Sequence, residues 1–362
     1  MIEEYHIPVI KFADPYVEDI CLTNWDKNNN LELDIEEAAA VTDIGVVFKE
    51  NTAITSFNEL SYFKSLESIG NEAFMECSNL KEITLPANVT SIGEDAFYDC
   101  TSLQTATLGE GLKTIGSQAF YGCSSLESVT IPAGVTSIAE DAYRNCSGLT
   151  SIKVAADNTV YDSRNNCNAI IVSETNTLLL GCQNTLIPLD VEAIGKNAFD
   201  GCTALTEIII PASVGAIGNF AFRSCSKLTT VIARNVTPVT LGSSYTFSNR
   251  KDATLYVPKA SVDAYKNANR WKDFKFIIGY EVGDANGDGK VTITDAVAVV
   301  NYILGNASTG FVKAAADVNQ DGNITITDAV GVVNIILNSG GEATAPAMAS
   351  PAVEAPEVAE PE

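Results

Sequence analysis

The chain has 362 residues, of which 46% are hydrophobic, so it is long enough for two or three folded domains. Its net charge of −24 and pI of about 4.3 exclude the basic footprint that nucleic acids or anionic membranes require. No apolar run approaches the roughly 20 residues of a membrane span. A single histidine, His6, leaves little scope for histidine catalysis or zinc chemistry.

A calcium-loop pattern lies near the start of the chain. The stretch DKNNNLELDIEE has oxygen-bearing groups at positions 1, 3, 5, 7, 9 and 12 of a twelve-residue loop, which is the ligand spacing of EF-hands. These groups belong to Asp26, Asn28, Asn30, Glu32 (through its carbonyl), Asp34 and Glu37. Leu31 occupies position 6, where such loops have a turn glycine. We expect residues 1–59 to form an N-terminal cap with an EF-hand-like loop, and an acidic loop without metal is the alternative.

The middle of the chain repeats every 23 residues. Units start with AFMEC at Ala73, AFYDC at Ala96 and AFYGC at Ala119, and the series continues at 142, 198 and 221. The single larger step, from 142 to 198, is one repeat plus 33 residues. Such a period is typical of a solenoid, in which each unit buries its apolar face only against its neighbours. Within a unit we expect a short strand before Pro86 and a helical turn at Phe97.

Cysteines and outward strand positions follow the same period. Six cysteines share one repeat position and are expected to stack as buried thiols: Cys77, Cys100, Cys123, Cys146, Cys202 and Cys225. The 33 extra residues are expected to form a hairpin turning at 174–177, which would place Cys167 opposite Cys182, so a disulfide there remains open. One outward register is polar (Thr84, Thr107, Thr130, Lys153), which indicates either ordinary exposed strands or a recognition face for a protein ligand.

Residues from about 60 to 278 resemble BspA-like leucine-rich repeats of bacterial surface proteins, in the repeated A-F-x-x-C units and in the insertion VYDSRNNCNAIIVSETNTLLLGC. The stretch LYVPKASVDAYKNANRWKDF resembles the terminal cap of that family, which would cover the open end of the stack. We therefore expect an α+β repeat fold with a leucine-rich-repeat solenoid at 60–279. The resemblance implies a secreted or cell-surface protein that adheres to host proteins or to other cells.

Two nearly identical acidic loops follow, GDANGDGKVTITDAV from 283 and ADVNQDGNITITDAV from 316. Each has calcium-type oxygen ligands at EF-hand spacing and glycine at position 6, so the sequence predicts two calcium sites. The first set is Asp284, Asn286, Asp288, Lys290 (carbonyl), Thr292 and Asp295, and the second is Asp317, Asn319, Asp321, Asn323 (carbonyl), Thr325 and Asp328. Each loop leads into an apolar helix, expected at 296–304 and 329–337, with Val297, Val300 and Leu304 on one packed face.

Duplicated loops that end in Asp, each followed by one helix, resemble dockerin domains, which bind cohesin modules. We expect a small all-α, calcium-binding dockerin-like domain at 280–339. The resemblance implies partner recognition at loop positions 10 and 11 and helix positions 17 and 18. These are Ile293, Thr294, Val300 and Asn301 in the first unit, and Ile326, Thr327, Val333 and Asn334 in the second. Clostridial dockerins tend to have hydroxyl or basic residues there, and a calcium-stabilised domain without a partner is the alternative.

The two recognition sets are identical in residue type, so rotating one unit onto the other would present nearly the same surface in two orientations. Together the patterns predict a non-catalytic bacterial binding protein, with a cohesin-like partner for the C-terminal domain and a protein or host-surface ligand for the solenoid. An enzyme-complex subunit and a structural spacer are the alternatives. The first residues lack a signal-peptide pattern. The Pro-, Ala- and Glu-rich stretch 340–362 is expected to be a disordered tail.

Overall fold

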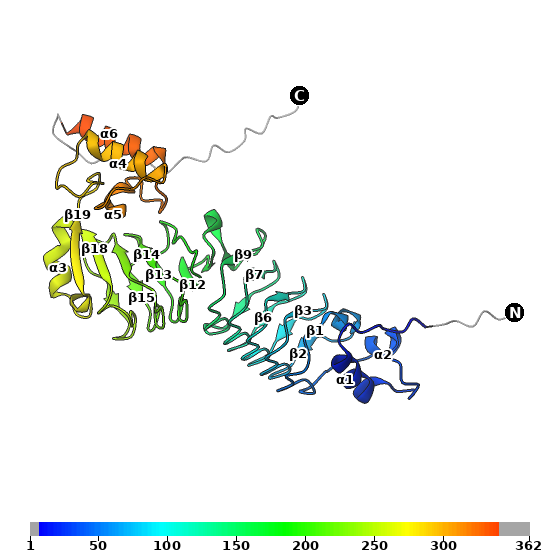
Figure 1. Cartoon of the computed structure of the whole chain (residues 1–362). Helices are drawn as coiled ribbons and strands as arrows, with labels where there is room; N and C mark the ends of the chain where they lie inside the picture. Colours follow the sequence, from blue (N-terminus) through cyan, green and yellow to red (C-terminus); the bar gives the residue numbers. More distant parts are fainter. Residues whose placement is uncertain (1–6, 340–362) are drawn as a thin grey trace, which may run out of the picture. The chain divides into compact units, whose positions relative to one another are not determined.

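Figure 1 shows the computed structural model of the chain, which describes residues 7–339. The chain divides into two compact units, and the main division lies between Glu281 and Val282. Each unit is described by itself, and the expected tail at 340–362 lies outside the described residues. None of the described helices combines the length and the apolar character needed to cross a membrane.

The first unit is a β-solenoid, as the 23-residue period predicts (Figure 1). One row of strands begins each coil: β1 (Ser56–Phe57), β3 (Glu82–Thr84), β5 (Thr105–Thr107), β7 (Ser128–Ile131), β9 (Ser151–Val154), β14 (Glu207–Ile210), β16 (Thr230–Ala233), β18 (Thr254–Pro258) and β19 (Phe276–Tyr280). A second row has two-residue strands: β2 (Ser68–Ile69), β4 (Ser91–Ile92), β6 (Thr114–Ile115), β8 (Ser137–Ile138), β13 (Ala193–Ile194), β15 (Ala216–Ile217) and β17 (Thr240–Leu241). Pairing within both rows is parallel, for example Ser91 with Thr114.

A ladder of aromatic rings runs through the core of the coils. Phe97 stacks on Phe74 at 5.2 Å and on Phe120 at 5.0 Å, and Tyr143 continues the ladder at 5.0 Å from Phe120. After the insertion, Phe199, Phe222 and Phe247 resume it at spacings of 4.9 and 4.7 Å. Because these rings are buried against the next coil rather than within their own, each coil depends on its neighbours for its core.

The repeated cysteines stack as buried free thiols, which confirms the prediction. Each thiol donates to the carbonyl oxygen of a core residue in the preceding coil, as Cys100 Sγ does to Phe74 at 3.1 Å and Cys123 Sγ to Phe97 at 3.2 Å. Burial raises the pKa of Cys77 to about 12. The thiols therefore act as small apolar side chains that also satisfy a carbonyl group.

The insertion contains the predicted hairpin, which consists of β11 (Ala169–Val172) and β12 (Thr177–Gly181), with β10 (Tyr161–Asp162) alongside. A register shift between Ile170 and Ile171 displaces the pairing by one residue. Cys182 therefore lies opposite Asn168, with its Sγ 3.6 Å from the Asn168 carbonyl oxygen. Both Cys167 and Cys182 are free, so the structure contains no disulfide between them.

A buried carboxylate joins the coils on either side of the insertion. Asp200, whose side chain is 0% exposed, accepts a hydrogen bond from Arg144 Nε at 2.7 Å and pairs with Arg223 of the following coil. The backbone N–H of Asn145 also donates to the Asp200 carbonyl at 3.3 Å. Coil stacking thus continues although 33 extra residues separate these coils in the sequence.

Helical segments lie at both ends of the solenoid. At the start, α1 (Pro15–Trp25), α2 (Ile35–Ala39) and the 3-10 helix η1 (Asn58–Tyr62) contribute Val17 and Ala38 to the same buried core as the first coils. At the end, η3 (Lys259–Ser261), α3 (Val262–Asn267) and η4 (Trp271–Asp273) bury Tyr265 and Trp271 on the last coils. A further 3-10 turn, η2 (Arg164–Asn166), lies in the insertion.

The second unit contains α4 (Ile293–Ile303), α5 (Lys313–Ala316) and α6 (Ile326–Asn338). Helices α4 and α6 begin three residues earlier than expected, because a capping box in each, such as Thr292 with Asp295, starts the helix inside the loop. The expected packed face was wrong for two of its three residues. Val297 and Leu304 are 52% and 66% exposed, whereas Val300 packs partly buried against the core. The buried positions are occupied by Ala296, Ala298 and Val299 in α4 and by Ala329 and Val332 in α6.

We predict that Tyr143→Phe stabilises the solenoid by about 1–2 kcal/mol, because the buried Tyr143 hydroxyl has no hydrogen-bond partner. Urea unfolding of the full chain measures the shift of the solenoid transition. Tyr121→Phe is the control, since the Tyr121 hydroxyl accepts from Asn145 Nδ2 at 2.8 Å and its loss should not stabilise. A lower midpoint for Tyr143→Phe would show that the hydroxyl is satisfied.

We predict that a thiol reagent modifies none of the nine cysteines in the folded protein and all nine after unfolding, because every one is buried and free. Counting labelled thiols by intact-protein mass spectrometry checks this. If denaturation without reductant exposes only seven thiols to the reagent, two of the nine cysteines are joined in a disulfide. That result would contradict the absence of a Cys167–Cys182 disulfide.

Candidate calcium loops and docking groove

The first C-terminal loop is organised around its acidic residues. Asp284 Oδ2 accepts from the Gly289 N–H at 2.9 Å, and Gly289 takes the left-handed φ of +86° that the sharp turn requires. Asn286 Oδ1 accepts from the Asp288 N–H at 2.8 Å, and Asp288 Oδ1 accepts from the Lys290 N–H at 2.9 Å. The predicted ligand residues are therefore brought together on one loop.

The last residue of each C-terminal loop ties the loop to its helix. Asp295 is fully buried, and its two oxygens accept from the N–H groups of Asn286 at 2.9 Å and of Thr292 at 2.8 Å. Asp328 repeats this arrangement in the second loop, where it accepts from Asn319 at 3.2 Å and from Thr325 at 3.0 Å. Each helix start is thus fixed by the same residue that the sequence places at ligand position 12.

The donor set fits a hard divalent cation. Asp284 is only 7% exposed, and its buried Oδ1 accepts no hydrogen bond from the part of the chain that the structure describes, which is unfavourable for a carboxylate unless a cation faces it. Among residues 7–339 no three or more His, Cys, Asp or Glu side chains alone form a metal cluster. The loops instead combine carboxylates with Asn side chains, a Thr hydroxyl and backbone carbonyls, as calcium prefers.

The N-terminal loop has the same hydrogen-bond pattern. Asp26 Oδ2 accepts from the Leu31 N–H at 2.9 Å, and Glu37 accepts from Lys27 at 3.0 Å and from Asp34 at 3.2 Å. Leu31 takes the left-handed conformation of the missing glycine, with φ of +64° and 80% exposure. No buried side-chain oxygen of this loop lacks a partner, which distinguishes it from the Asp284 loop. Calcium binding here stays a prediction.

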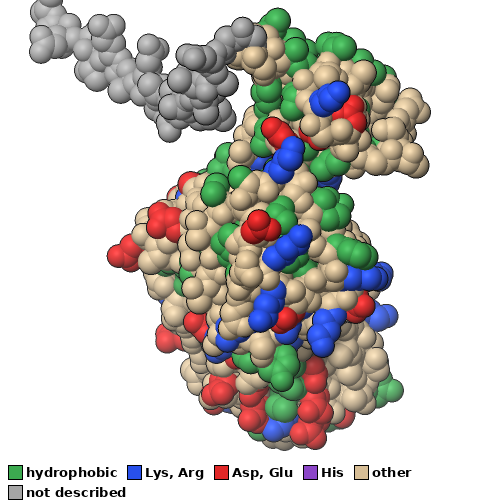
Figure 2. Space-filling view, turned by 90° about the vertical axis from the view of Figure 1, so that its left-hand side faces the viewer, with side chains coloured by type: hydrophobic (Ala, Val, Ile, Leu, Met, Phe, Trp, Pro, Cys, Tyr) green, Lys and Arg blue, Asp and Glu red, His purple; other side chains and the backbone are tan. Residues whose placement is uncertain are grey.

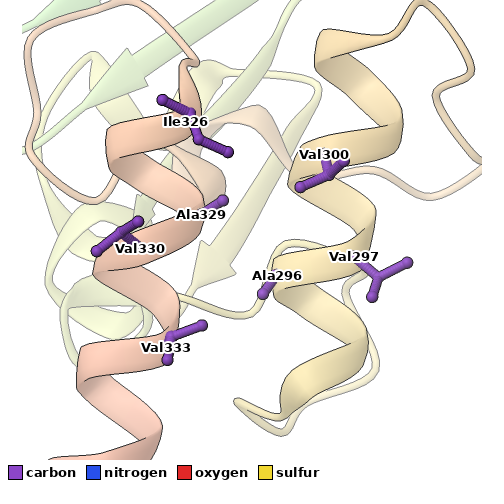
Figure 3. A pocket seen from close by; sticks show the side chains of 7 residues that line it. All are labelled: Ala296, Val297, Val300, Ile326, Ala329, Val330 and Val333. Carbon is purple, nitrogen blue, oxygen red and sulfur yellow. The ribbon is translucent and has the colours of Figure 1, made fainter.

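An apolar groove lies between α4 and α6. Figure 3 shows its lining side chains, which come from both helices and enclose a volume of about 370 Å³: Ala296, Val297, Val300, Ile326, Ala329, Val330 and Val333. The lining includes no polar or charged residue. Val297, Ile326 and Val330 are each more than half exposed, so the groove is open to a partner.

The predicted recognition residues only partly line this groove. Val300, Ile326 and Val333 belong to the lining, whereas Ile293, Thr294, Asn301, Thr327 and Asn334 do not. Thr294 Oγ1 lies 2.7 Å from Thr292 Oγ1 and 3.1 Å from Asn286 Nδ2, so its hydroxyl contacts its own loop. The sequence analysis did not predict Ala296, Val297, Ala329 and Val330 as groove residues, although equal residue types at equal repeat positions were a signal for them.

The outward face of the solenoid changes character along its length. The outward residues Thr107, Thr130 and Lys153 are exposed, as predicted for the first coils. After the insertion, the corresponding register contains Ile209, Ile232, Tyr256 and Ile278, of which Ile232 is buried. The polar register of the first coils therefore does not continue into the C-terminal coils.

Family comparisons agree with both units. A family model described as "BspA type Leucine rich repeat region" matches six copies over residues 47–170 and 180–269, and a "Dockerin type I domain" model matches residues 282–337. The chain belongs to the BspA-type leucine-rich-repeat family and has a type I dockerin domain at its C-terminal end. A search of curated proteins found no match.

Solved structures of bacterial leucine-rich-repeat proteins are similar to this chain. The pneumococcal vaccine antigen PcpA is 18% identical, with a TM-score of 0.41, over 61% of this chain and 72% of its own. A leucine-rich-repeat protein from Bacteroides ovatus is 21% identical, with a TM-score of 0.45, over 75% and 67%. One from T. pallidum is 24% identical, with a TM-score of 0.31, over 49% and 67%.

Proposed function

We propose that this protein is a non-catalytic binding protein of the bacterial cell surface or exterior, which attaches through its dockerin domain to a cohesin-like partner. The solenoid would then present a face that binds a protein or a host-surface ligand. The family matches support a protein-binding module with a docking domain. The partner, the ligand and the location are proposals of this article.

The groove between α4 and α6 is the observation that carries the docking proposal. A domain of this size buries its apolar residues where it can, yet Val297, Ile326 and Val330 remain exposed around an open, wholly apolar depression. Exposed apolar patches of this kind mark interaction sites. Because Val297 and Val330 occupy equal positions of the two loop-helix units, a partner can meet similar contacts in two orientations.

The loops would hold the two helices in place. Asp284, Asn286 and Asp288, with the Lys290 carbonyl, would hold one calcium ion, and the matching residues from Asp317 would hold the second. When bound, calcium supplies charge compensation for the buried carboxylates. The chain itself contributes the link to the groove, since Asp295 and Asp328 join each loop to the first turn of a groove helix.

We further propose the domain limits 1–59, 60–279 and 280–339. The shared core of α1 and α2 with the first coils supports an N-terminal cap, because an uncovered first coil would expose its apolar side. Likewise, the buried Trp271 and Tyr265 support a terminal cap on the last coils.

We predict that the full chain binds calcium at two C-terminal sites, and that Asp284→Ala and Asp317→Ala each remove one ion from the stoichiometry measured by isothermal titration calorimetry. At millimolar calcium and an assumed dissociation constant of about 10 μM, each site adds about 2.7 kcal/mol to stability. Asp26→Ala is the matched variant for the N-terminal loop, and a third ion lost in it would extend the proposal there. Unchanged stoichiometry in both C-terminal variants would contradict the proposal.

We predict that Val297→Asp and Val330→Asp weaken partner binding to the same extent, each by more than about ten-fold, because both side chains line one groove and exchanging the two orientations exchanges the two valines. The partner is first captured from surface proteins of the source cells by the full chain with calcium. Surface plasmon resonance then compares the variants, with Thr107→Asp on the solenoid as control. A large loss of binding in only one of the two variants would rule out two equivalent orientations.

A further inference from the structure

Four lysines form an exposed surface on the last coil of the solenoid. Lys251, Lys266, Lys272 and Lys275 are all exposed, and none forms an ion pair within residues 7–339. The backbone N–H of Lys275 donates to the carbonyl of Arg250 at 3.0 Å, which brings the segments around 250 and 275 together. Figure 2 shows Lys and Arg side chains gathered on the side where α3 and β18 lie. We call these four residues the lysine surface.

The lysine surface is exceptional in this chain. Residues 250–280 contain seven Lys and Arg against three Asp and Glu, a formal charge of +4, although the whole chain carries −24. Asp273 is paired with Arg250 at 3.4 Å and Lys259 with Glu281 at 2.7 Å, so Asp252 and Asp263 are the acidic groups that remain near the four lysines. Two carboxylates against four lysines leave a local excess of positive charge.

The coils before the insertion have the opposite charge. Residues 60–170 contain 13 Asp and Glu against six Lys and Arg, a formal charge of −7. A ridge of carboxylates follows the turns of two adjacent coils: Glu72, Glu76, Glu94, Asp95 and Asp99. Burial and the neighbouring Glu94, Glu72 and Asp141 raise the pKa of Asp95, and Lys49, which pairs with Glu72 at 2.5 Å, is the cation beside these carboxylates. We call the five residues the acidic ridge.

We propose that the lysine surface of one copy docks on the acidic ridge of a second copy, so that the chains associate head to tail. The two surfaces lie on different coils of one solenoid and cannot meet within a chain. Nucleic acids and other long polyanions fit less well, because they would extend over the acidic coils. In a contact between two different surfaces of identical chains, each assembly keeps one free surface at either end. Further copies can therefore add, which gives open rows of molecules.

The first test is the mass of the full chain, 38.4 kDa as a monomer, measured by analytical ultracentrifugation at about 20 mM and about 500 mM NaCl. We expect masses above the monomer at low salt and monomer alone at high salt. The chain is kept in calcium, and Val297 and Val330 are unchanged, so failure here is distinguishable from failure of the dockerin proposal. A monomer at both salt concentrations and at high protein concentration overturns the inference.

Complementary variants test the pairing itself. Variant A changes Lys251, Lys266, Lys272 and Lys275 to Gln, and variant B changes Glu76 and Glu94 to Gln, so that neither variant gains a surface of the opposite charge. Each alone should remain monomeric, whereas an equimolar mixture should form a 1:1 dimer and nothing larger, because only A's ridge and B's lysines remain functional. Thermal melting confirms that both variants fold, and Lys→Ala or Glu→Ala versions replace any that do not. Continued association of A alone, or no dimer in the mixture, overturns the inference. So does tight binding of the unchanged chain to anionic vesicles or oligonucleotides that variant A loses.

Discussion

Stacking of coil on coil is the interaction on which the first unit depends. No coil contains enough residues to enclose its own core, so the rings from Phe74 to Tyr143 and the thiols from Cys77 to Cys146 find their partners in adjacent coils. Two consequences follow. The ends require other covering elements, and any insertion must leave the next coil in stacking register. The hairpin satisfies the second requirement, and Asp200 joins the coils beside it.

The dockerin domain also has too few residues for a large apolar core, and it is stabilised in a different way. Its helices approach through Ala296, Ala329 and the buried Val299 and Val332, which is a small interface. The loops compensate, since each buries an aspartate that binds its own backbone and the first helical turn. The apolar residues that remain outside this interface line the groove. Because few apolar residues enter the core, the domain depends on its loops for stability, and the apolar residues outside the core form a surface that a partner can contact.

Regular features could be predicted from the sequence, and local irregularities could not. The 23-residue period predicted the solenoid and the thiol stack, because every copy repeats the same burial. The expectation that Cys167 lies opposite Cys182 was wrong because one extra residue in β12 shifts the register, which no residue pattern reveals. The packed face of α4 was assigned to Val297, whereas the structure buries Ala296 and Val299, and the small side chain of Ala296 allows the helices to pack closely. The apolar residues of the outward register after the insertion, such as Ile209 and Tyr256, are visible in the sequence. The prediction nevertheless used only the polar residues of the earlier coils.

The central claim is that calcium-binding loops hold α4 and α6 so that their groove can receive a partner, while the solenoid folds without metal. Hydrogen–deuterium exchange of the full chain, with calcium and with chelator, tests it most directly. The account predicts that chelation removes protection from the amides of α4 and α6 and leaves the strands from β3 to β18 unchanged. Equal protection of α4 and α6 in both conditions would contradict it.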